Sequence, residues 1–531
     1  MHKGPTSFHR EDIMKLFKLI TIVLFCLLAI YIFPAGSVFA EEVEMVVELR
    51  DGIYGTTPSS LYAYDDSLFF TGYNTDAQQS LYKWDGNSAV IVGGSTGAGI
   101  SNLASHNGSL YMEANSQLYQ YDEVSVQIAQ APNSEHSYGG GSPSYLGSVG
   151  DKLYYVMQTS SHGKELYSYN SADGVQIVSD IVPGSGSSHT QDVAASDSGV
   201  YFTACDVGDG SNYELWYADN STGQVSKTEL NPGGKSSPSN KLILNDGRLV
   251  MTAEIDSANI GQEAYIYDPV SGQISLMGDV LDGSADSYPS NFVEMGDVVY
   301  FKANSSWYGE YAAGKELFSW DDENGLQLAA DINPGSANSM GWGNMAQYGN
   351  AIYFAAEDGS GEQEVWKYDP VNGAQQVTDI NTSGDSSPNY FTVADNVLYF
   401  SANDGVTGKE LWKITAEPKW VELYLNWMGM PYTQDDQGAI LDILLNQSGS
   451  YSYGEGAISY ITDALLPGDD GSREIGDYWE YAGKKYLKTG SGIVYAPSGG
   501  EEPAAPELPM GMAQMMVLGL GGLLARFRRR A

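Results

Sequence analysis

A short hydrophobic triplet, Leu-Tyr-Phe or a close variant, recurs eight times along this chain of 531 residues. The copies begin at Leu68, Leu110, Leu153, Val200, Leu249, Val299, Ile352 and Leu398, so that neighbouring copies lie 42 to 53 residues apart. Repeats of this length are typical of architectures in which each copy forms one unit and packs against the next. The spacing therefore predicts a ring or a stack of similar units.

Each copy divides into four segments with the composition of short β-strands. The last copy supplies three of them, at 389–394, 397–402 and 409–414, and fourth segments lie at 175–181, 326–332 and 374–380. Turn residues such as Asp395-Asn396 and "DPVNG" (369–373) join the first segment to the second and the third to the fourth. A longer polar link leads to the next copy. This wiring is typical of a four-stranded β-propeller blade.

The two ends of the repeat region complement each other. The last copy stops after its third strand at Ile414, and a single strand-like segment at 43–52 precedes the first copy. If that segment completes the last blade, the ring has no open edge. We therefore expect an all-β, eight-bladed β-propeller over residues 43–414, closed by its N-terminal strand. A ring of seven blades, without the degenerate copy at Leu110, and an open β-solenoid are the alternatives.

The repeat also resembles a known family. The segments "LYFSANDGVTGKELW" (398–412) and "DINPGS" (331–336) are similar to the ELWxxDGT, or hyalin-like, repeats of bacterial surface proteins. The resemblance covers 43–414, but the Asp-Gly-Thr ending of the repeat has mostly changed, for example to "YDPVNG". It implies a secreted or cell-surface propeller, and it assigns no catalytic residues.

The N-terminus has the pattern of a secretory signal peptide over residues 1–40. Lys15 and Lys18 precede an apolar run, and "SVFA" supplies small residues before a predicted cleavage after Ala40. Cleavage leaves Cys205 as the one cysteine of the exported chain, so an intrachain disulfide is excluded.

The C-terminus has the pattern of a sorting tail. A Pro/Gly/Glu linker at 497–509 precedes a segment at 510–531 that is apolar and ends in arginines. The tail resembles the PEP-CTERM class of bacterial signals, with "PELP" in place of Pro-Glu-Pro, and this implies processing by an exosortase-like membrane enzyme. A permanent membrane anchor is the alternative. In both cases we expect the middle of the chain to be at the cell surface or extracellular, and membrane-associated through the tail before processing.

Between the ring and the linker, residues 415–496 predict a small α+β module. Residues 433–447 have the pattern of a helix with Thr433 as its N-cap, and 477–496 that of a β-hairpin. The formal net charge of the whole chain is −41. Such acidity argues against a nucleic-acid partner, because phosphates need Lys and Arg, and it suits an extracellular protein that binds cations.

A glutamate recurs in the third strand of six copies, at Glu165, Glu214, Glu263, Glu316, Glu364 and Glu410. A ring of carboxylates for cations is one interpretation. We favour a structural one, because a catalytic group is needed once, whereas a hydrogen bond that stabilises a blade is needed in every blade. The sequence has no phosphate-binding loop or metal-binding His pair.

One blade also resembles a second family. "ANDGVTGKELW" (402–412) fits the A-x-D-x-x-T-G-x-x-x-W pattern of quinoprotein dehydrogenases, which would imply pyrroloquinoline quinone with Ca²⁺. The match occurs in this copy alone, and the cysteine pair of those alcohol dehydrogenases cannot form. A shared corner between two strands also explains the match.

Binding of a ligand is favoured over catalysis. The long loop at 302–315 and the link that follows offer candidate ligand-binding residues: Trp307, Tyr308, Glu310, Tyr311 and Trp342. Aromatic faces beside carboxylates suit a carbohydrate or peptide, although these rings could equally pack the loop down. Aspartates near the starts of such loops could hold Ca²⁺ or cap backbone amides: Asp206, Asp209, Asp256, Asp358 and Asp404.

We therefore expect an exported cell-surface propeller for adhesion to, or recognition of, an extracellular carbohydrate or protein. The alternative is a secreted enzyme on the same scaffold, either a quinoprotein dehydrogenase or a carbohydrate-active enzyme.

Overall fold

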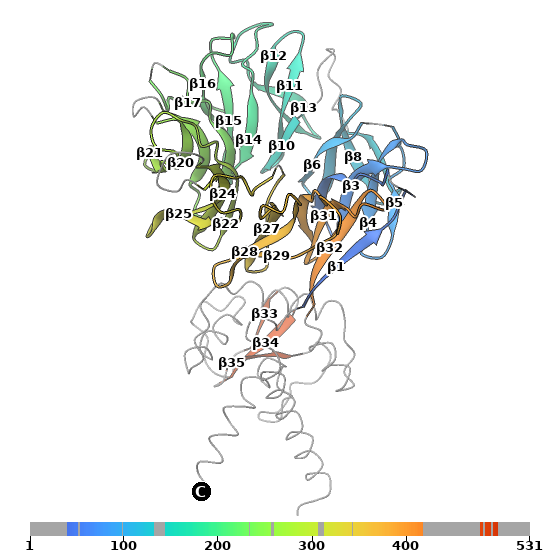
Figure 1. The fold of residues 1–531 in the computed structure, drawn as a ribbon. Coiled ribbons are helices and arrows are strands. Elements are labelled where there is room, and N and C mark those ends of the chain that lie inside the picture. Colours follow the sequence, from blue (N-terminus) through green and yellow to red (C-terminus); the bar gives the residue numbers. More distant parts are fainter. Residues whose placement is uncertain are drawn as a thin grey trace, which may run out of the picture. The chain divides into compact units, whose positions relative to one another are not determined.

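The computed structural model describes residues 40–131, 144–417 and 478–496, apart from residues 51, 53, 98, 233, 256–259, 306–312, 342, 482, 483, 490 and 491. Residues 41–416 form one compact unit, and 478–496 belong to a second. The described elements are all β-strands (Figure 1). Among them the chain has no helix with the length and apolarity needed to cross a membrane.

The larger unit is an eight-bladed β-propeller (Figure 1). Blades 1 to 4 each pair four consecutive strands: β2 (Ser59–Tyr64), β3 (Ser67–Tyr73), β4 (Gln79–Trp84) and β5 (Ala89–Ile91); β6 (Ser101–His106), β7 (Ser109–Ala114), β8 (Gln117–Asp122) and β9 (Gln127–Gln130); β10 (Ser144–Val149), β11 (Lys152–Thr159), β12 (Gly163–Asn170) and β13 (Gly174–Ser179); β14 (Gln191–Ala195), β15 (Gly199–Cys205), β16 (Tyr213–Asp219) and β17 (Val225–Thr228). The copy at Leu110 thus forms a complete blade, so the ring has eight blades and not seven.

Blades 5 to 7 repeat this pattern: β18 (Ser239–Ile243), β19 (Leu249–Glu254), β20 (Gln262–Asp268) and β21 (Gln273–Gly278); β22 (Ser290–Met295), β23 (Val298–Asn304), β24 (Lys315–Asp321) and β25 (Gly325–Ala330); β26 (Ala346–Tyr348), β27 (Ala351–Ala356), β28 (Glu364–Asp369) and β29 (Gly373–Gln376). The first strands contact one another around the whole ring, including β2 beside the first strand of blade 8, so they surround the axis.

Blade 8 is built from both ends of the propeller. Its strand order is β1-β32-β31-β30, with β30 (Asn389–Ala394), β31 (Val397–Asn403), β32 (Lys409–Glu417) and the N-terminal β1 (Ala40–Val47). Figure 1 shows the dark blue β1 beside the orange β32. The predicted closure is therefore confirmed, with the closing strand at 40–47 instead of 43–52.

The second unit contains a three-stranded antiparallel sheet of β33 (Tyr478–Tyr481), β34 (Lys484–Thr489) and β35 (Gly492–Ala496). The sequence predicts a hairpin here, and the structure adds a third strand. The helix predicted at 433–447 lies outside the described residues.

The hydrophobic core lies mainly between the blades. Each buried cluster combines side chains of two neighbours; Val250 of blade 5, for example, packs with Phe301 and Phe318 of blade 6. Leu68 of blade 1 and Leu411 of blade 8 share a further cluster, against which Val46 of β1 packs. The apolar face of one blade is thus buried by the next, so the ring needs every blade in place.

Aromatic pairs recur at these junctions. In each blade one residue of the third strand, here called the wedge residue, lies opposite the first residue of the triplet: Trp84, Tyr121, Tyr169, Ala218, Tyr267, Trp320, Tyr368 and Ile414. Wedge tyrosines pack their rings on the preceding blade, with centroid distances of 5.0 Å for Phe69–Tyr121, 5.7 Å for Tyr111–Tyr169, 6.3 Å for Tyr201–Tyr267 and 5.5 Å for Tyr300–Tyr368. Ala218 is the small exception.

Candidate functional site

The strand order gives the propeller two different faces. The loops between second and third strands and the links between blades share one end of the ring, the crossover face. The turns between first and second and between third and fourth strands share the other end, the turn face. Tight turns are typical there: Asp395 and Asn396, with φ of 45° and 59°, both adopt the left-handed conformation.

The recurring glutamate is a buried clamp at the crossover face. In blade 6 the Glu316 carboxylate accepts hydrogen bonds from the amides of Ile332 (2.9 Å) and Ser339 (2.8 Å), which belong to the link to blade 7. In blade 5 Glu263 receives the amide of Val280 (3.2 Å) and the hydroxyl of Ser287 (2.6 Å). These bonds tie the third strand to the following link, as the structural interpretation expects.

Burial changes the titration of these clamps. It raises the pKa of Glu165, Glu316 and Glu410 to about 7 and that of Glu263 to about 8, against the lowering effect of their hydrogen bonds. Transfer of a carboxylate out of water disfavours its charged form, which explains the direction. These four clamps respond to pH, and all six recurring glutamates are at most 2 % exposed and so face no ligand.

The Gly-Lys-Glu signature ahead of the clamp has a steric reason. Gly314 has a φ of +76°, and a Cβ at this position would lie 2.0 Å from the carbonyl oxygen of Ala337 in the neighbouring link. Only glycine leaves the space for the link to pass this strand.

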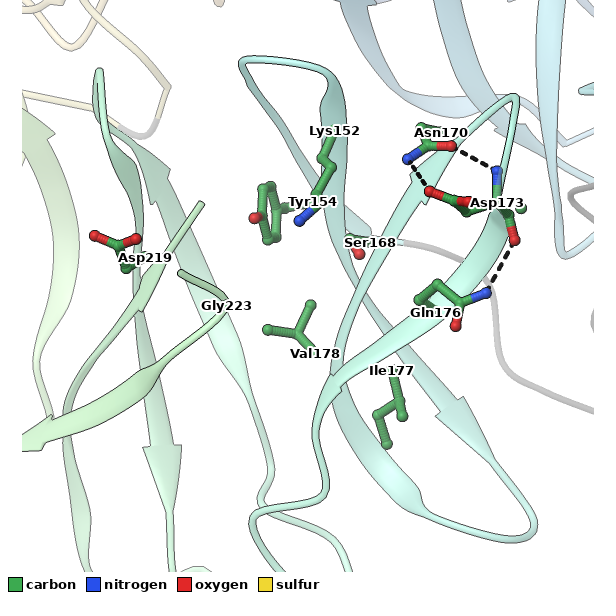
Figure 2. A pocket seen from close by; sticks show the side chains of 11 residues that line it. Lys152, Tyr154, Ser168, Asn170, Asp173, Gln176, Ile177, Val178, Asp219 and Gly223 are labelled. Carbon is green, nitrogen blue, oxygen red and sulfur yellow. Dashed lines mark hydrogen bonds between the residues drawn. The ribbon is translucent and has the colours of Figure 1, made fainter. Parts of the chain in front are cut away.

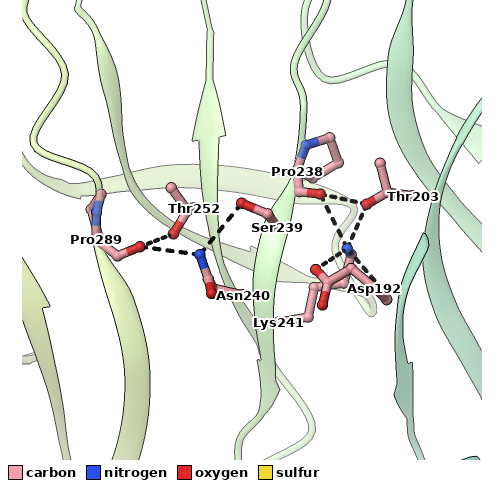
Figure 3. Close-up of polar contacts among 8 residues, drawn as sticks. All are labelled: Asp192, Thr203, Pro238, Ser239, Asn240, Lys241, Thr252 and Pro289. Atoms are coloured by element: carbon pink, nitrogen blue, oxygen red, sulfur yellow. Dashed lines mark hydrogen bonds and ion pairs between the residues drawn. The ribbon is translucent and has the colours of Figure 1, made fainter. Parts of the chain in front are cut away.

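Buried polar contacts also join blades 4, 5 and 6 near the crossover face (Figure 3). The Lys241 side chain is fully buried, and its ammonium donates to Asp192 Oδ2 (2.7 Å), to Thr203 Oγ1 (2.5 Å) and to the Pro238 carbonyl (3.2 Å). One blade further on, Thr252 donates to the Pro289 carbonyl (2.5 Å). Burial lowers the pKa of Lys241, and Asp192 acts in the opposite direction. These contacts connect blades, and the Lys241 ammonium is buried among its partners.

A second buried lysine lies between blades 6 and 7. The Lys302 ammonium donates to the carbonyl oxygens of Gly341 (3.2 Å) and Gly343 (2.8 Å). Burial lowers its pKa to about 7, and the nearby Lys315 adds to the effect. Its acceptors are backbone atoms of the link to blade 7, so this lysine also has a structural role.

The described aspartates of the calcium prediction lie in three separate loops of the crossover face. Three of them accept a hydrogen bond from a backbone amide of their own loop: Asp209 from Ser211 (2.9 Å), Asp358 from Ser360 (3.1 Å) and Asp404 from Thr407 (2.7 Å). Asp206 forms an ion pair with Lys227 (2.9 Å). No group of three or more His, Cys, Asp or Glu residues suited to a metal occurs within the described ranges. Asp256 lies outside them. Calcium at these loops stays a prediction, which melting with calcium and with a chelator would test.

The segment similar to quinoprotein dehydrogenases forms a corner between two strands. Asp404 caps the Val406 amide (2.8 Å), and the Trp412 indole donates to the Ala402 carbonyl (3.1 Å). The indole of Trp216 makes the same bond to Ala204 in blade 4 (3.1 Å). A hydrogen bond shared by two blades fits a corner that stabilises the fold.

The aromatic candidates of the sequence, Trp307, Tyr308, Glu310, Tyr311 and Trp342, lie outside the described residues. Within the described part, however, five exposed tyrosines all belong to the crossover face: Tyr54, Tyr73, Tyr145, Tyr288 and Tyr390. Tyr73 ends a second strand, and Tyr54 and Tyr288 lie in links between blades. Tyr145 and Tyr390 are the second residues of the first strands β10 and β30. Sequence reasoning missed them because it singled out only the longest loop.

Three of these tyrosines have a strained backbone. Tyr145, Tyr288 and Tyr390 have φ values of 56°, 50° and 59°, in the left-handed region that bulky residues rarely adopt. At the position of Tyr145 and Tyr390, other blades have Ser60, Asn102, Asp192, Asn240 and Asn291, which are mostly residues that tolerate this conformation. Tyrosine there does not favour folding, and strain of this kind is typical of functional positions.

A polar groove of about 480 Å³ lies on the turn side between blades 3 and 4 (Figure 2). Lys152, Tyr154 and Val178 of blade 3 line one wall, and Asp219 and Gly223 of blade 4 line the other. The Tyr154 hydroxyl donates to Asn220 Oδ1 (2.9 Å) across the junction. Burial, with the charges of Asp151 and Asp219, raises the Tyr154 pKa to about 12, so the phenol stays protonated.

No family model and no curated protein matches the sequence. Solved structures with a similar fold include a mutant of puromycin hydrolase complexed with PGG (13% identity, TM-score 0.42, 65% of this chain and 58% of that one). They also include the computationally designed Ika8 protein (15%, 0.43, 69% and 99%) and the β-propeller domain of the Trilobed protease from Pyrococcus furiosus (11%, 0.37, 61% and 96%). The chain thus spans less than two thirds of the puromycin hydrolase. Likenesses this distant give no information on activity.

Proposed function

We propose that this protein is an exported cell-surface propeller that recognises an extracellular carbohydrate or protein through its crossover face. The observation that carries the proposal is the gathering of exposed tyrosine rings on this face. A tyrosine offers a flat apolar surface with a hydroxyl at its edge, and both suit binding to sugars and to peptides. The left-handed backbone of Tyr145 and Tyr390 supports the same role, because folding alone would favour asparagine there.

Export is supported by the position of the closing strand. β1 spans Ala40–Val47, so the predicted cleavage after Ala40 would remove only the first residue of the strand. The Glu41 carboxylate accepts a hydrogen bond from the Tyr353 hydroxyl (2.9 Å) and pairs with Lys367. An exported chain that starts at Glu41 would thus keep these two contacts with blade 7. The tail at 510–531 would then hold the propeller near the membrane until an exosortase-like enzyme processes it.

Binding of the exported chain to an array of glycans and immobilised extracellular proteins tests the proposal. We expect binding without turnover, and a variant carrying both Tyr145→Asn and Tyr390→Asn should lose most of it. Asparagine tolerates the left-handed backbone, so this variant should fold at least as well as the natural protein. Val124→Asn with Val270→Asn, on exposed tips of the turn face, is the matched control and should bind normally.

Equal loss of binding in both double variants would place the ligand elsewhere. Alanine at Trp307 and Tyr308 then shows whether the long loop contributes to the same site. Chemical conversion of a bound glycan, or dye reduction after reconstitution with pyrroloquinoline quinone and Ca²⁺, would support the enzymatic alternative instead.

A further inference from the structure

The groove between blades 3 and 4 lies beside the blade whose wedge residue is the smallest. Seven blades have an aromatic residue or isoleucine at this position, and blade 4 has Ala218. At several other junctions this side chain is an aromatic ring that packs beside the preceding blade; Trp84, for example, donates its indole N–H to the Tyr399 hydroxyl (3.2 Å). Ala218 is too small to do so, and it is buried in one cluster with Tyr154 of blade 3. The junction beside the groove therefore departs from the repeat.

The charged groups at this junction depart from the repeat as well. Between blades 5 and 6, Arg248 precedes the triplet, lies 5.8 Å from the ring centroid of Trp320 and makes a bidentate pair with Asp322 (3.0 and 2.7 Å). The corresponding residues of blades 3 and 4 are Lys152, Ala218 and Asn220. Where blade 6 has the Asp322 carboxylate that neutralises Arg248, blade 4 has the amide of Asn220. The Tyr154 hydroxyl donates a hydrogen bond to the oxygen of that amide.

Lys152 consequently keeps a free ammonium. Among the described residues it makes no ion pair, and it lies half-buried on the wall of the groove (Figure 2). An ammonium partly removed from water gains from a carboxylate partner, as Arg248 does from Asp322. No described carboxylate of this chain supplies that partner, so a ligand can.

The opposite wall offers an acceptor. Asp219 Oδ1 already receives the Thr222 amide (2.7 Å) and the Ser221 hydroxyl (2.7 Å), whereas within the described part of the chain Oδ2 receives no hydrogen bond. Asp173 and the nearby Asp151 add negative charge around the groove. A simple anion would be repelled by these carboxylates and by the net charge of the chain, −41. A simple cation would be repelled by Lys152.

We propose that the groove between blades 3 and 4 binds a small zwitterion, a free α-amino acid, with its carboxylate on Lys152 and its ammonium on Asp219. Ile177 and Val178 form an apolar part of the lining against which a short aliphatic side chain packs. The volume of about 480 Å³ is within the range of small-molecule sites. This site is separate from the crossover face, so the two can be tested independently.

Isothermal titration of the exported chain with glycine, L-alanine, L-valine and L-leucine tests the proposal. We expect saturable binding of at least one of them. Isobutyrate and isobutylamine, each with only one of the two charges of valine, should bind at least about tenfold more weakly, because each leaves one charged wall unpaired. Absence of binding for all four amino acids, or equal binding of isobutyrate, would overturn the proposal.

Three variants should each weaken amino-acid binding in the groove, for different reasons. Lys152→Met removes the cation, Asn220→Asp gives Lys152 the internal partner that Arg248 has, and Ala218→Tyr restores the tyrosine that other blades carry at this position. Each should weaken amino-acid binding at least about tenfold. Arg248→Met, the matched change at the junction of blades 5 and 6, should leave binding unchanged.

Each of the three variants tests the proposal independently of the other two. Asn220→Asp and Ala218→Tyr copy residues that the chain already uses at equivalent positions, and a cooperative melt establishes that each variant has folded. Amino-acid binding that survives in the folded Lys152→Met and Asn220→Asp variants would place the ligand outside this groove and refute the assignment.

Discussion

The two faces of the propeller use the same residue types for different purposes. At the crossover face a recurring set of acidic and basic side chains is buried: Glu263 and Glu316 clamp the links, and Lys241 joins blades 4 and 5. At the turn face aspartates near solvent cap their own turns, as Asp268 does for the Val270 amide (2.8 Å) and the Ser271 hydroxyl (2.7 Å). Charge removed from water is costly unless paired, whereas exposed charge is screened. Identical chemistry therefore contributes unequally to stability at the two ends.

The largest expected effect is at the buried ion pair. Asp192→Ala leaves the Lys241 ammonium buried without its carboxylate, which we expect to lower the free energy of unfolding by about 3 kcal/mol. Unfolding in urea measures this loss of free energy. Asp206→Ala, which breaks the half-exposed pair with Lys227, is the control and should cost no more than about 1 kcal/mol. Equal losses in both variants would contradict the distinction between the two kinds of pair.

The second largest expected loss of unfolding free energy is at a clamp glutamate, Glu263. Glu263→Ala leaves the Val280 amide without its acceptor and removes the shorter of the two hydrogen bonds of the Ser287 hydroxyl, for an expected loss of about 2 kcal/mol. Glu263→Gln keeps an acceptor oxygen and should lose less than half as much in the same urea titration. If glutamine is as damaging as alanine, the carboxylate does more than accept hydrogen bonds.

The pH dependence of stability sharpens the comparison further. Four of the buried clamps, Glu165, Glu263, Glu316 and Glu410, have pKa values of about 7 to 8 in the folded protein, above the ordinary value of 4.5. The folded state therefore holds more protons than the unfolded state between these values. Their contribution to stability is complete below pH 4.5 and is lost as the pH rises through 7 to 8. We expect the free energy of unfolding to fall from pH 5 to pH 7, by up to about 1 kcal/mol per pH unit for each clamp.

The net negative charge of the chain gives a change of the same sign, and His106, whose pKa burial lowers, gives a small opposite one. Glu263→Gln separates the clamp from both, because it removes one titrating group from the folded core. The slope between pH 5 and pH 7 should therefore be smaller in this variant. An unchanged slope would show that the clamps are not its source.

The smallest expected effect is at the turn face. Asp268→Ala removes an exposed cap whose hydrogen bonds compete with water, so its melting temperature should lie within the scatter of replicate melts. A loss comparable to that of Glu263→Ala would mean that the turn face is as sensitive to loss of a carboxylate as the crossover face.

Much of the fold follows from local sequence. The strands predicted at 389–394 and 397–402 are β30 and, with one further residue, β31, because alternating side chains and turn residues are local signals. Fourth strands end earlier than predicted; β25 stops at Ala330 and not at 332. The difference arises because the Ile332 amide bonds to Glu316 and thus belongs to the link.

The candidate sites depend on neighbours that are distant in the chain. Alignment of the eight repeats could have singled out Ala218, but its consequence depends on Lys152 and Tyr154 of the preceding blade. The exposure of Tyr145 and Tyr390 likewise depends on how the first strands of the blades meet around the axis. Local periodicity carries no information on either arrangement.

By itself, the sequence determined the repeat and its four strands and predicted eight blades, with seven as the alternative, and closure of the ring by the N-terminal strand. Each of these rests on spacing and on turns between adjacent residues. Only the tertiary structure decided which carboxylates are buried as clamps, which rings face outward and where two blades leave a groove. Burial and pairing are properties of the junction between blades, where residues separated by some fifty positions meet, and they exist only once the ring has formed.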